Sequence, residues 1–247
     1  DDLVWSEPQA YPARFRAYLK SAMRFSLRAA DAVIFPSTDA MRRVSAHFSL
    51  GSKGAAIWSP LDPTRYQIGG KRRPVILIPG SAEPRKNLAL AVDAASRIPH
   101  HEVRLLGYRG TAFPADMILP PMDEDAVAAA FATAAAIAVP SRAEGFGYAI
   151  AQAITAGTPL VCSDIPVFRE LADGCARFLK PDRAAGWELA LAEACDGANA
   201  ETQRLVSAGK SRSEVFSPAR FADQFLRAID ATQEPVGNSH QCATTGK

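Results

Sequence analysis

The alternation of short apolar runs with longer amphipathic stretches constrains the fold of this chain more than any other feature. The short runs have the length and aliphatic character of strands, and the longer stretches carry apolar residues three to four positions apart. The strand-like runs are Ala32–Phe35, Pro74–Pro79, Glu102–Leu106, Ala135–Val139, Pro159–Cys162 and Ala176–Leu179. The helix-like segments between them are Leu88–Arg97, Asp123–Ala134, Phe146–Ala156 and Ala184–Cys195. This rhythm predicts an α/β fold with a doubly wound parallel sheet that helices cover on both faces.

The domain boundaries follow from the places where this rhythm is absent. Further helices are predicted at Ala13–Ala30, Thr38–Phe48, Glu201–Val215 and Pro218–Ala231. Prolines, glycines and a basic run interrupt the pattern between Trp58 and Pro74. We therefore predict a remnant of another domain over residues 1–60, a hinge over 61–73, a large domain over 74–231 and a disordered tail over 232–247.

Composition and charge exclude several classes of protein. The chain has 28 Lys and Arg against 26 Asp and Glu and is 48% hydrophobic, which does not fit a disordered chain or a dedicated nucleic-acid binder. No apolar stretch is long enough to predict a membrane span. The cysteines form no CxxC pair and the histidines show no ligand spacing, so we predict no metal site and expect a reducing cytoplasm. Because the chain begins at Asp1 without a leader-like segment, we expect a piece of a longer protein.

The first candidate binding loop lies directly after the predicted strand Pro74–Pro79. It contains Gly80, Ser81, Arg85 and Lys86 and leads into a helix that is predicted to start near Asn87. A helix start at the carboxyl edge of a parallel sheet offers free N–H groups to an anion, and the two cations add to this, so the loop predicts a phosphate or diphosphate site. The alternative is an ordinary proline-containing helix start with solvated basic residues. The loop matches neither the Walker nor the GxGxxG pattern.

The second candidate loop follows the predicted strand Ala135–Val139. Gly145 and Gly147 leave room for the backbone to approach a ligand, and Glu144 places a carboxylate at the start of the next helix. Gln152 follows eight residues after Glu144, about 12 Å further along that helix. This spacing suits a long ligand with hydroxyl groups at both ends. The alternatives are a carboxylate that compensates the helix dipole and a glutamine that faces solvent.

Taken together, the two loops and the segments after them resemble the family 4 retaining glycosyltransferases. The matching segments are Glu83-Pro84-Arg85-Lys86-Asn87, Pro140-Ser141, Glu144-Gly145-Phe146-Gly147, Ala156-Gly157-Thr158-Pro159, Ser163-Asp164-Ile165-Pro166 and Glu170. Their order and separation agree with that family over residues 74–230. The resemblance implies the Rossmann-like C-terminal half of a GT-B architecture. Residues 29–37 look like the last strand of the family's N-terminal domain.

The resemblance also implies a role for each residue of the two loops. Glu144 would be the catalytic residue and would bind hydroxyls of the donor sugar, while Lys86 and Arg85 would neutralise the donor diphosphate. The amides of Phe146 and Gly147 would contact sugar and phosphate, with Gly80, Ser81 and Gly145 completing the donor site. Gln152 stands where the family usually has a glutamate for the ribose, and an amide can still bond a diol. Neither a metal nor a cofactor is implied.

The expected activity is transfer of a hexose, for example mannose, from a nucleotide-diphosphate sugar to a saccharide or a lipid-linked acceptor. Two alternatives remain: an enzyme of the sugar phosphorylase, sucrose synthase or trehalose synthase type, and a non-catalytic nucleotide-sugar-binding partner. We expect this chain by itself to bind the donor but to transfer little.

The basic segment Ala13–Ala30 suggests a second kind of partner. It carries Phe15, Leu19, Met23 and Leu27 at intervals of four, among arginines and a lysine. Such a helix could lie on an anionic membrane surface as a peripheral contact. Packing of the helix on its own domain is the favoured alternative.

Overall fold

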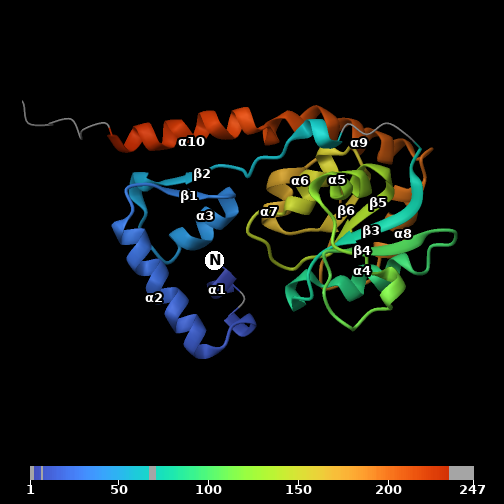
Figure 1. The fold of residues 1–247 in the computed structure, drawn as a ribbon, viewed down its shortest axis with the longest axis horizontal. Helices are drawn as coiled ribbons and strands as arrows, with labels where there is room; N and C mark the ends of the chain where they lie inside the picture. The colour runs from blue at the N-terminus through green and yellow to red at the C-terminus, as the bar shows by residue number, and fades with distance from the viewer. Residues whose placement is uncertain (1–2, 7, 67–70, 234–247) are drawn as a thin grey trace, which may run out of the picture.

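The structure is a computed structural model that describes residues 3–6, 8–66 and 71–233. These residues form two lobes joined by the segment that leads into β3 (Figure 1). The smaller lobe contains a two-stranded parallel sheet of β1 (Val33–Phe35) and β2 (Gly54–Ala56), together with α2 (Ala13–Ala29) and α3 (Thr38–Ser45). A short helix, α1 (Leu3–Ser6), precedes them.

The larger lobe is built on five parallel strands in the order β4-β3-β5-β6-β7. The strands are β3 (Arg73–Pro79), β4 (Glu102–Leu106), β5 (Ala134–Val139), β6 (Leu160–Ser163) and β7 (Arg177–Leu179). The helices that connect and follow them are α4 (Leu88–Ala95), α5 (Glu124–Thr133), α6 (Tyr148–Thr155), α7 (Pro166–Ala172), α8 (Trp187–Cys195) and α9 (Ala200–Arg212). The predicted doubly wound α/β fold is therefore confirmed.

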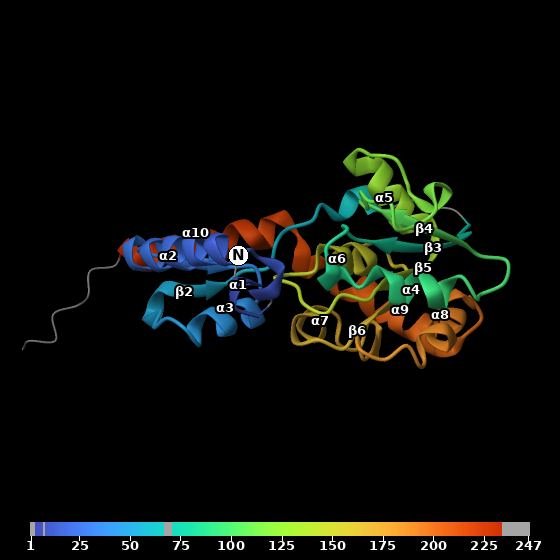
Figure 2. The same cartoon turned by 90° about the horizontal axis from the view of Figure 1, so that it is seen from below.

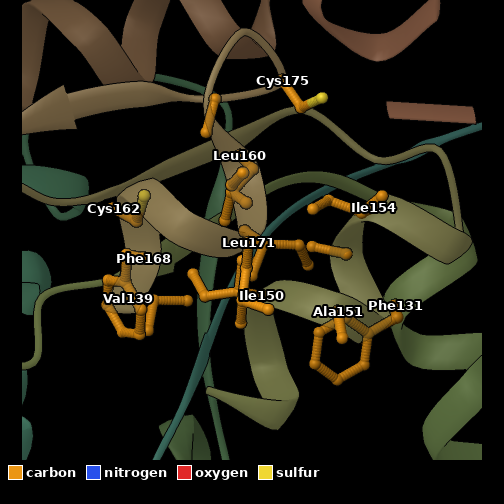
Figure 3. Close-up of a cluster of buried hydrophobic side chains, with 14 of the residues drawn as sticks. Phe131, Val139, Ile150, Ala151, Ile154, Leu160, Cys162, Phe168, Leu171 and Cys175 are labelled. Carbon is orange, nitrogen blue, oxygen red and sulfur yellow. The ribbon is translucent and has the colours of Figure 1, made fainter. Parts of the chain in front are cut away.

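Alternate residues of the central strands point to opposite faces of the sheet and join two separate cores. Ile76 and Ile78 of β3 pack with α4 and α8, whereas Leu77 between them packs with α5, α6 and α7. Strand β5 is buried along its whole length, as expected for a strand covered on both faces. In the second of these cores, Ile150 and Ile154 of α6 lie near Leu171 of α7 (Figure 3).

Strand β2 and helix α7 are among the elements that were not expected from the sequence. Strand β2 consists of one glycine and two alanines, so it has neither the β-branched nor the large aliphatic residues that mark a strand. Helix α7 is only seven residues long and begins with Pro166, which gives too little periodicity to detect. The predicted helix Phe146–Ala156 starts later, at Tyr148, because Gly147 adopts a positive φ of 104° just before it.

The last helix, α10 (Pro218–Gln233), leaves the larger lobe and runs along β1 and β2 of the smaller one (Figures 1 and 2). It contains the first two residues of the predicted tail, and residues 234–247 lie outside the described part. Within the predicted hinge, Pro63–Tyr66 form a single 3₁₀ turn, and Tyr66 is buried in the larger lobe. Residues 67–70 of that segment also lie outside the described part, and its role as a hinge stays a prediction.

The apolar stripe of α2 packs on its own lobe. Met23 and Leu27 contact the small core formed by Phe35, Val44 and Leu50, whereas Phe15 at the other end of the stripe is 48% exposed. Packing of this helix on its own domain, the alternative that the sequence favoured, is therefore observed for the C-terminal half of the stripe.

The strand order places a topological switch point between β3 and β5. The chain leaves β3 toward β4 on one side of the sheet and leaves β5 toward β6 on the other. The connections therefore diverge and leave a crevice at the carboxyl ends of these two strands, which is where ligands bind in open α/β sheets. Gly80 follows β3 and Pro140 follows β5, so both candidate loops begin at this point.

Two leucines of α8 provide a matched test of this fold. Leu191 is fully buried between α8 and the sheet, whereas Leu189 on the same helix is 65% exposed. We expect Leu191→Ala to lower the free energy of unfolding by about 2–5 kcal/mol because it leaves a cavity in the core. Leu189→Ala should stay within about 0.5 kcal/mol of the unaltered chain. Urea unfolding of both variants measures the difference, and equal losses would contradict the packing described for α8.

Candidate active site

The two loops at the switch point are joined to each other by backbone contacts. The amide of Arg142 donates to the carbonyl of Arg85 at 2.8 Å. The side chain of Asn87 donates to the carbonyl of Pro140 at 3.2 Å. Asn87 itself has a left-handed φ of 55° and separates a 3₁₀ turn, Pro84–Lys86, from α4. Loops 80–87 and 140–147 therefore act as one structural unit, although about 60 residues separate them along the chain.

Glu144 is the centre of this unit. Its residue is 8% exposed, and its carboxylate accepts a hydrogen bond from the Ser141 hydroxyl at 2.8 Å. Its other two partners come from the first loop: Nζ of Lys86 lies 2.6 Å from Oε1, and Nη1 of Arg85 lies 2.9 Å from Oε2. A buried carboxylate is costly unless it is paired and hydrogen-bonded, and here three donors meet both conditions.

The side chain of Arg85 mainly connects the two loops. Burial alone would lower the pKa of its guanidinium, but the carboxylates of Glu144 and Glu83 outweigh this and raise the pKa above its ordinary value. Besides these two carboxylates, it holds the carbonyl of Ala143 at 3.1 Å. Its charge is therefore permanent but already engaged by the protein.

Gly147 allows the loop to turn sharply into α6. Its φ of 104° is one that residues with a side chain rarely adopt. A Cβ at this position would lie 2.8 Å from a ring carbon of Phe168, so the space is closed as well. The glycine thus brings the first turn of α6 directly against the loop that carries Glu144.

A cavity of about 440 Å³ borders both loops and the first turns of α6, a volume typical of small-molecule sites. It is lined by Pro36, Ser59, Pro79, Gly80, Lys86, Val139, Glu144, Phe146, Gly147, Tyr148, Ala149 and Gln152. A second cavity of about 490 Å³ shares Tyr148 and Gln152 with the first. A third, of about 550 Å³, shares Met122 and Val127 with the second. The three form a row that begins at Glu144 and passes Gln152.

The structure brings most of the predicted site residues together. Gly80, Lys86, Glu144, Phe146, Gly147 and Gln152 all line the first cavity. Gly145 belongs to the same loop without lining the cavity. Arg85 lies behind Glu144, and Ser81 points elsewhere, because its hydroxyl donates to Glu83 at 2.8 Å.

Sequence reasoning missed residues that the smaller lobe and the linker contribute to the site. Pro36 and Ser59 line the cavity, and Ser37 and Arg43 hold the loop that carries Glu144. Tyr148, 52% exposed at the cavity, was also missed, although it directly follows Gly147. The position of Tyr148 directly after the glycine loop could have indicated its role, whereas no local sequence pattern marks the residues of the smaller lobe and the linker.

The described residues offer no cluster for a metal and no membrane-spanning helix. No group of three or more His, Cys, Asp or Glu side chains is arranged there to hold a metal ion. In the same part of the chain, no helix is both long and apolar enough to cross a membrane.

Comparison with known proteins identifies the family. The model of the family described as Glycosyl transferases group 1 matches residues 73–197, just over half of the chain. The chain belongs to this glycosyltransferase family. The matched segment runs from the first residue of β3 to two residues beyond the end of α8 and contains both loops of the site. The resemblance inferred from the loop motifs is therefore confirmed.

Solved structures support the same fold for this glycosyltransferase. Sucrose-phosphate synthase from Thermosynechococcus elongatus matches with a TM-score of 0.70 and 20% identity, over 90% of this chain and 63% of that one. Anabaena HepE in complex with UDP-glucose matches with a TM-score of 0.75 and 17% identity, over 91% of this chain and 70% of that one. At these identities the likeness concerns the fold alone.

One curated relative matches over a short segment of the glycosyltransferase. The O-antigen chain mannosyltransferase RfbU of Salmonella typhimurium is 38% identical over 61 residues. That segment is 25% of this chain and 17% of the relative. The roles of individual site residues are not decided by any of these matches and stay predictions.

Proposed function

We propose that this chain is the donor-binding half of a retaining glycosyltransferase that moves a hexose from a nucleotide-diphosphate sugar to a saccharide or lipid-linked acceptor. The observation that carries the proposal is the meeting of Lys86 and Glu144 at the switch point, beside two cavities of about 440 and 490 Å³ that share Tyr148 and Gln152. No metal or cofactor is part of the proposal. Cations and backbone amides stabilise the departing diphosphate instead.

The diphosphate would lie against Lys86 and the backbone of loop 140–147. Within the described residues, no protein group accepts from the amides of Gly145, Phe146 and Gly147. These amides precede α6, whose N-terminal end carries partial positive charge. An anion there gains hydrogen bonds that the protein itself leaves unmade.

Glu144 and the diphosphate compete for Lys86. In the structure the lysine is paired with the carboxylate, and its side chain is 20% exposed. When phosphate oxygens draw Lys86 away, Oε1 of Glu144 becomes available to accept from hydroxyl groups of the donor sugar. Arg85 would keep the carboxylate in place during this exchange, because it also holds the loop backbone.

Gln152 would bind the ribose of the donor. It borders both the first and the second cavity, so it lies where a nucleoside would pass from one to the other. Tyr66, a buried residue of the linker, lies beside it: burial raises the pKa of the Tyr66 phenol, and its interaction with the Gln152 side chain partly opposes that rise. The Gln152 amide has both donor and acceptor groups for a diol.

The relatives support different details of the donor and acceptor. The partial match to a mannosyltransferase of O-antigen supports mannose and polysaccharide biosynthesis. Solved neighbours include a complex with UDP-glucose and a UDP-forming trehalose-phosphate synthase from Burkholderia xenovorans, which matches with a TM-score of 0.66 and 18% identity. A synthase of the sucrose or trehalose type, or a non-catalytic nucleotide-sugar-binding partner, is the alternative function.

We further propose that the enzyme works in the cytoplasm as a peripheral membrane protein, with the outer face of α2 on an anionic bilayer. Tyr18 and Phe25 on this face are 65% and 74% exposed. Arg14, Arg24 and Arg28 are exposed on the same helix. Exposed aromatic rings among arginines suit the headgroup region of such a membrane and would bring the enzyme to a lipid-linked acceptor.

Two lysines test the diphosphate site. Lys86→Ala should weaken binding of GDP or UDP by ten- to a hundredfold, about 1.5–3 kcal/mol, because it removes a charge-assisted contact. Lys71→Ala is the control, since Lys71 is exposed at the opposite end of β3 and should leave affinity unchanged. Calorimetric titration of the 247-residue chain measures both. Equal affinities for the two variants would refute the assignment of Lys86.

Phe25 tests the membrane contact. Phe25→Ser should reduce co-sedimentation of the chain with phosphatidylglycerol vesicles several-fold, because it removes the most exposed aromatic ring of α2. Leu226→Ser is the control, since Leu226 is also an exposed apolar residue, at 58%, but lies on a different helix, α10. Binding that is equally strong to phosphatidylcholine vesicles, or unchanged in Phe25→Ser, would contradict the proposal.

A further inference from the structure

The loop that carries Glu144 is held by side chains of the smaller lobe. The hydroxyl of Ser37 donates to the carbonyl of Gly145 at 2.7 Å. The guanidinium of Arg43 donates to the carbonyl of Glu144 at 2.9 Å. Since Arg85 holds the carbonyl of Ala143, three consecutive carbonyls of the loop have fixed partners.

These contacts determine where the loop amides point. In a trans peptide the carbonyl of one residue and the N–H of the next point in opposite directions, and the described residues contain no cis peptide bond. With the carbonyls of Glu144 and Gly145 directed at the smaller lobe, the amides of Gly145 and Phe146 are directed away from it. These are two of the amides that the proposed diphosphate would use.

The start of α3, which carries Ser37 and Arg43 on the smaller lobe, is itself bound to the larger lobe. Glu170 of α7 accepts from the amides of Thr38 and Asp39 at 2.8 and 3.0 Å, so it closes the first turn of α3 from across the lobe boundary. It also accepts from the indole of Trp58 at 2.8 Å.

Within the smaller lobe, two further contacts orient the side chains of Ser37 and Arg43. Ser37 accepts from the amide of Ala40 at 3.0 Å, so one hydroxyl both caps α3 and holds the loop. Asp39, which is buried, pairs with Arg43 and orients its guanidinium.

We propose that Ser37 and Arg43 are positioning residues for the donor loop, so that docking of the smaller lobe and binding of the donor are coupled. The inference rests on the proposed function. Because coupling of this kind is reciprocal, a bound nucleoside diphosphate also strengthens the contact between the lobes. Neither residue touches the ligand, and both act through the peptide units that follow Glu144 and Gly145.

Arg43 and Arg42 offer a matched pair for the test. Both lie on α3 near Asp39, but the side chain of Arg42 is 71% exposed and its nitrogen is 3.7 Å from the carboxylate. We expect Arg43→Ala to weaken binding of UDP or GDP by the 247-residue chain about tenfold, the effect of losing one well-placed hydrogen bond to the loop. Arg42→Ala should change it less than twofold, and Arg43→Lys, which keeps a donor, should recover part of the affinity.

A second variant and a spectroscopic measurement separate positioning from folding. Ser37→Gly removes the hydroxyl that holds Gly145 while glycine still serves as a helix cap, so α3 is retained and affinity should fall. In ¹H–¹⁵N spectra without ligand, the amide signals of Gly145 and Phe146 should move in Arg43→Ala and Ser37→Gly but not in Arg42→Ala. If Arg43→Ala does not fold, the affinity and the amide signals of Ser37→Gly decide whether the loop is positioned by the smaller lobe.

The outcomes distinguish this inference from the function on which it rests. An unaltered chain that binds no nucleoside diphosphate would overturn both. An unaltered chain that binds, with Arg43→Ala and Ser37→Gly binding as tightly as Arg42→Ala, would overturn only the positioning role.

Discussion

The site depends on one buried carboxylate, that of Glu144, shared by Ser141, Lys86 and Arg85. A carboxylate with so little exposure is stable only where cations reach it, and these cations come from the loop after a different strand. That requirement fixes the two loops side by side. Neighbouring parallel strands bring the loops that follow them to the same edge of the sheet, and the diverging connections of β3 and β5 leave a crevice there.

The same arrangement makes the site responsive to its ligand. Lys86 is held by a charge that a diphosphate would replace, whereas Arg85 is bound to the loop backbone as well and stays with Glu144. The carbonyls of the loop are held by Ser37, Arg43 and Arg85, whereas the amides of Gly145 and Phe146 have no acceptor among the described residues. Under the proposed function, this one loop would offer both a carboxylate to hydroxyl groups and amides to phosphate.

The larger lobe could be predicted from the sequence because its strands are dense aliphatic runs and both loops follow such runs directly. Strand β2 could not, since Gly54–Ala56 carries no side chain that marks a strand. The pairing of Lys86 with Glu144 was also missed: separate roles were assigned to the two residues, which are 58 positions apart in the sequence. The contacts of Arg43 and Ser37 span 101 and 108 positions, and only the folded chain reveals them.

A ¹H–¹⁵N titration of the chain with UDP and with GDP tests most directly the claim that loop 140–147 receives the diphosphate of a nucleotide sugar. The account predicts that the amides of Gly145, Phe146 and Gly147 shift most, and that the Nζ signal of Lys86 moves as it leaves Glu144. Saturable shifts confined to residues away from this loop, such as those around Arg109 in the third cavity, would contradict it.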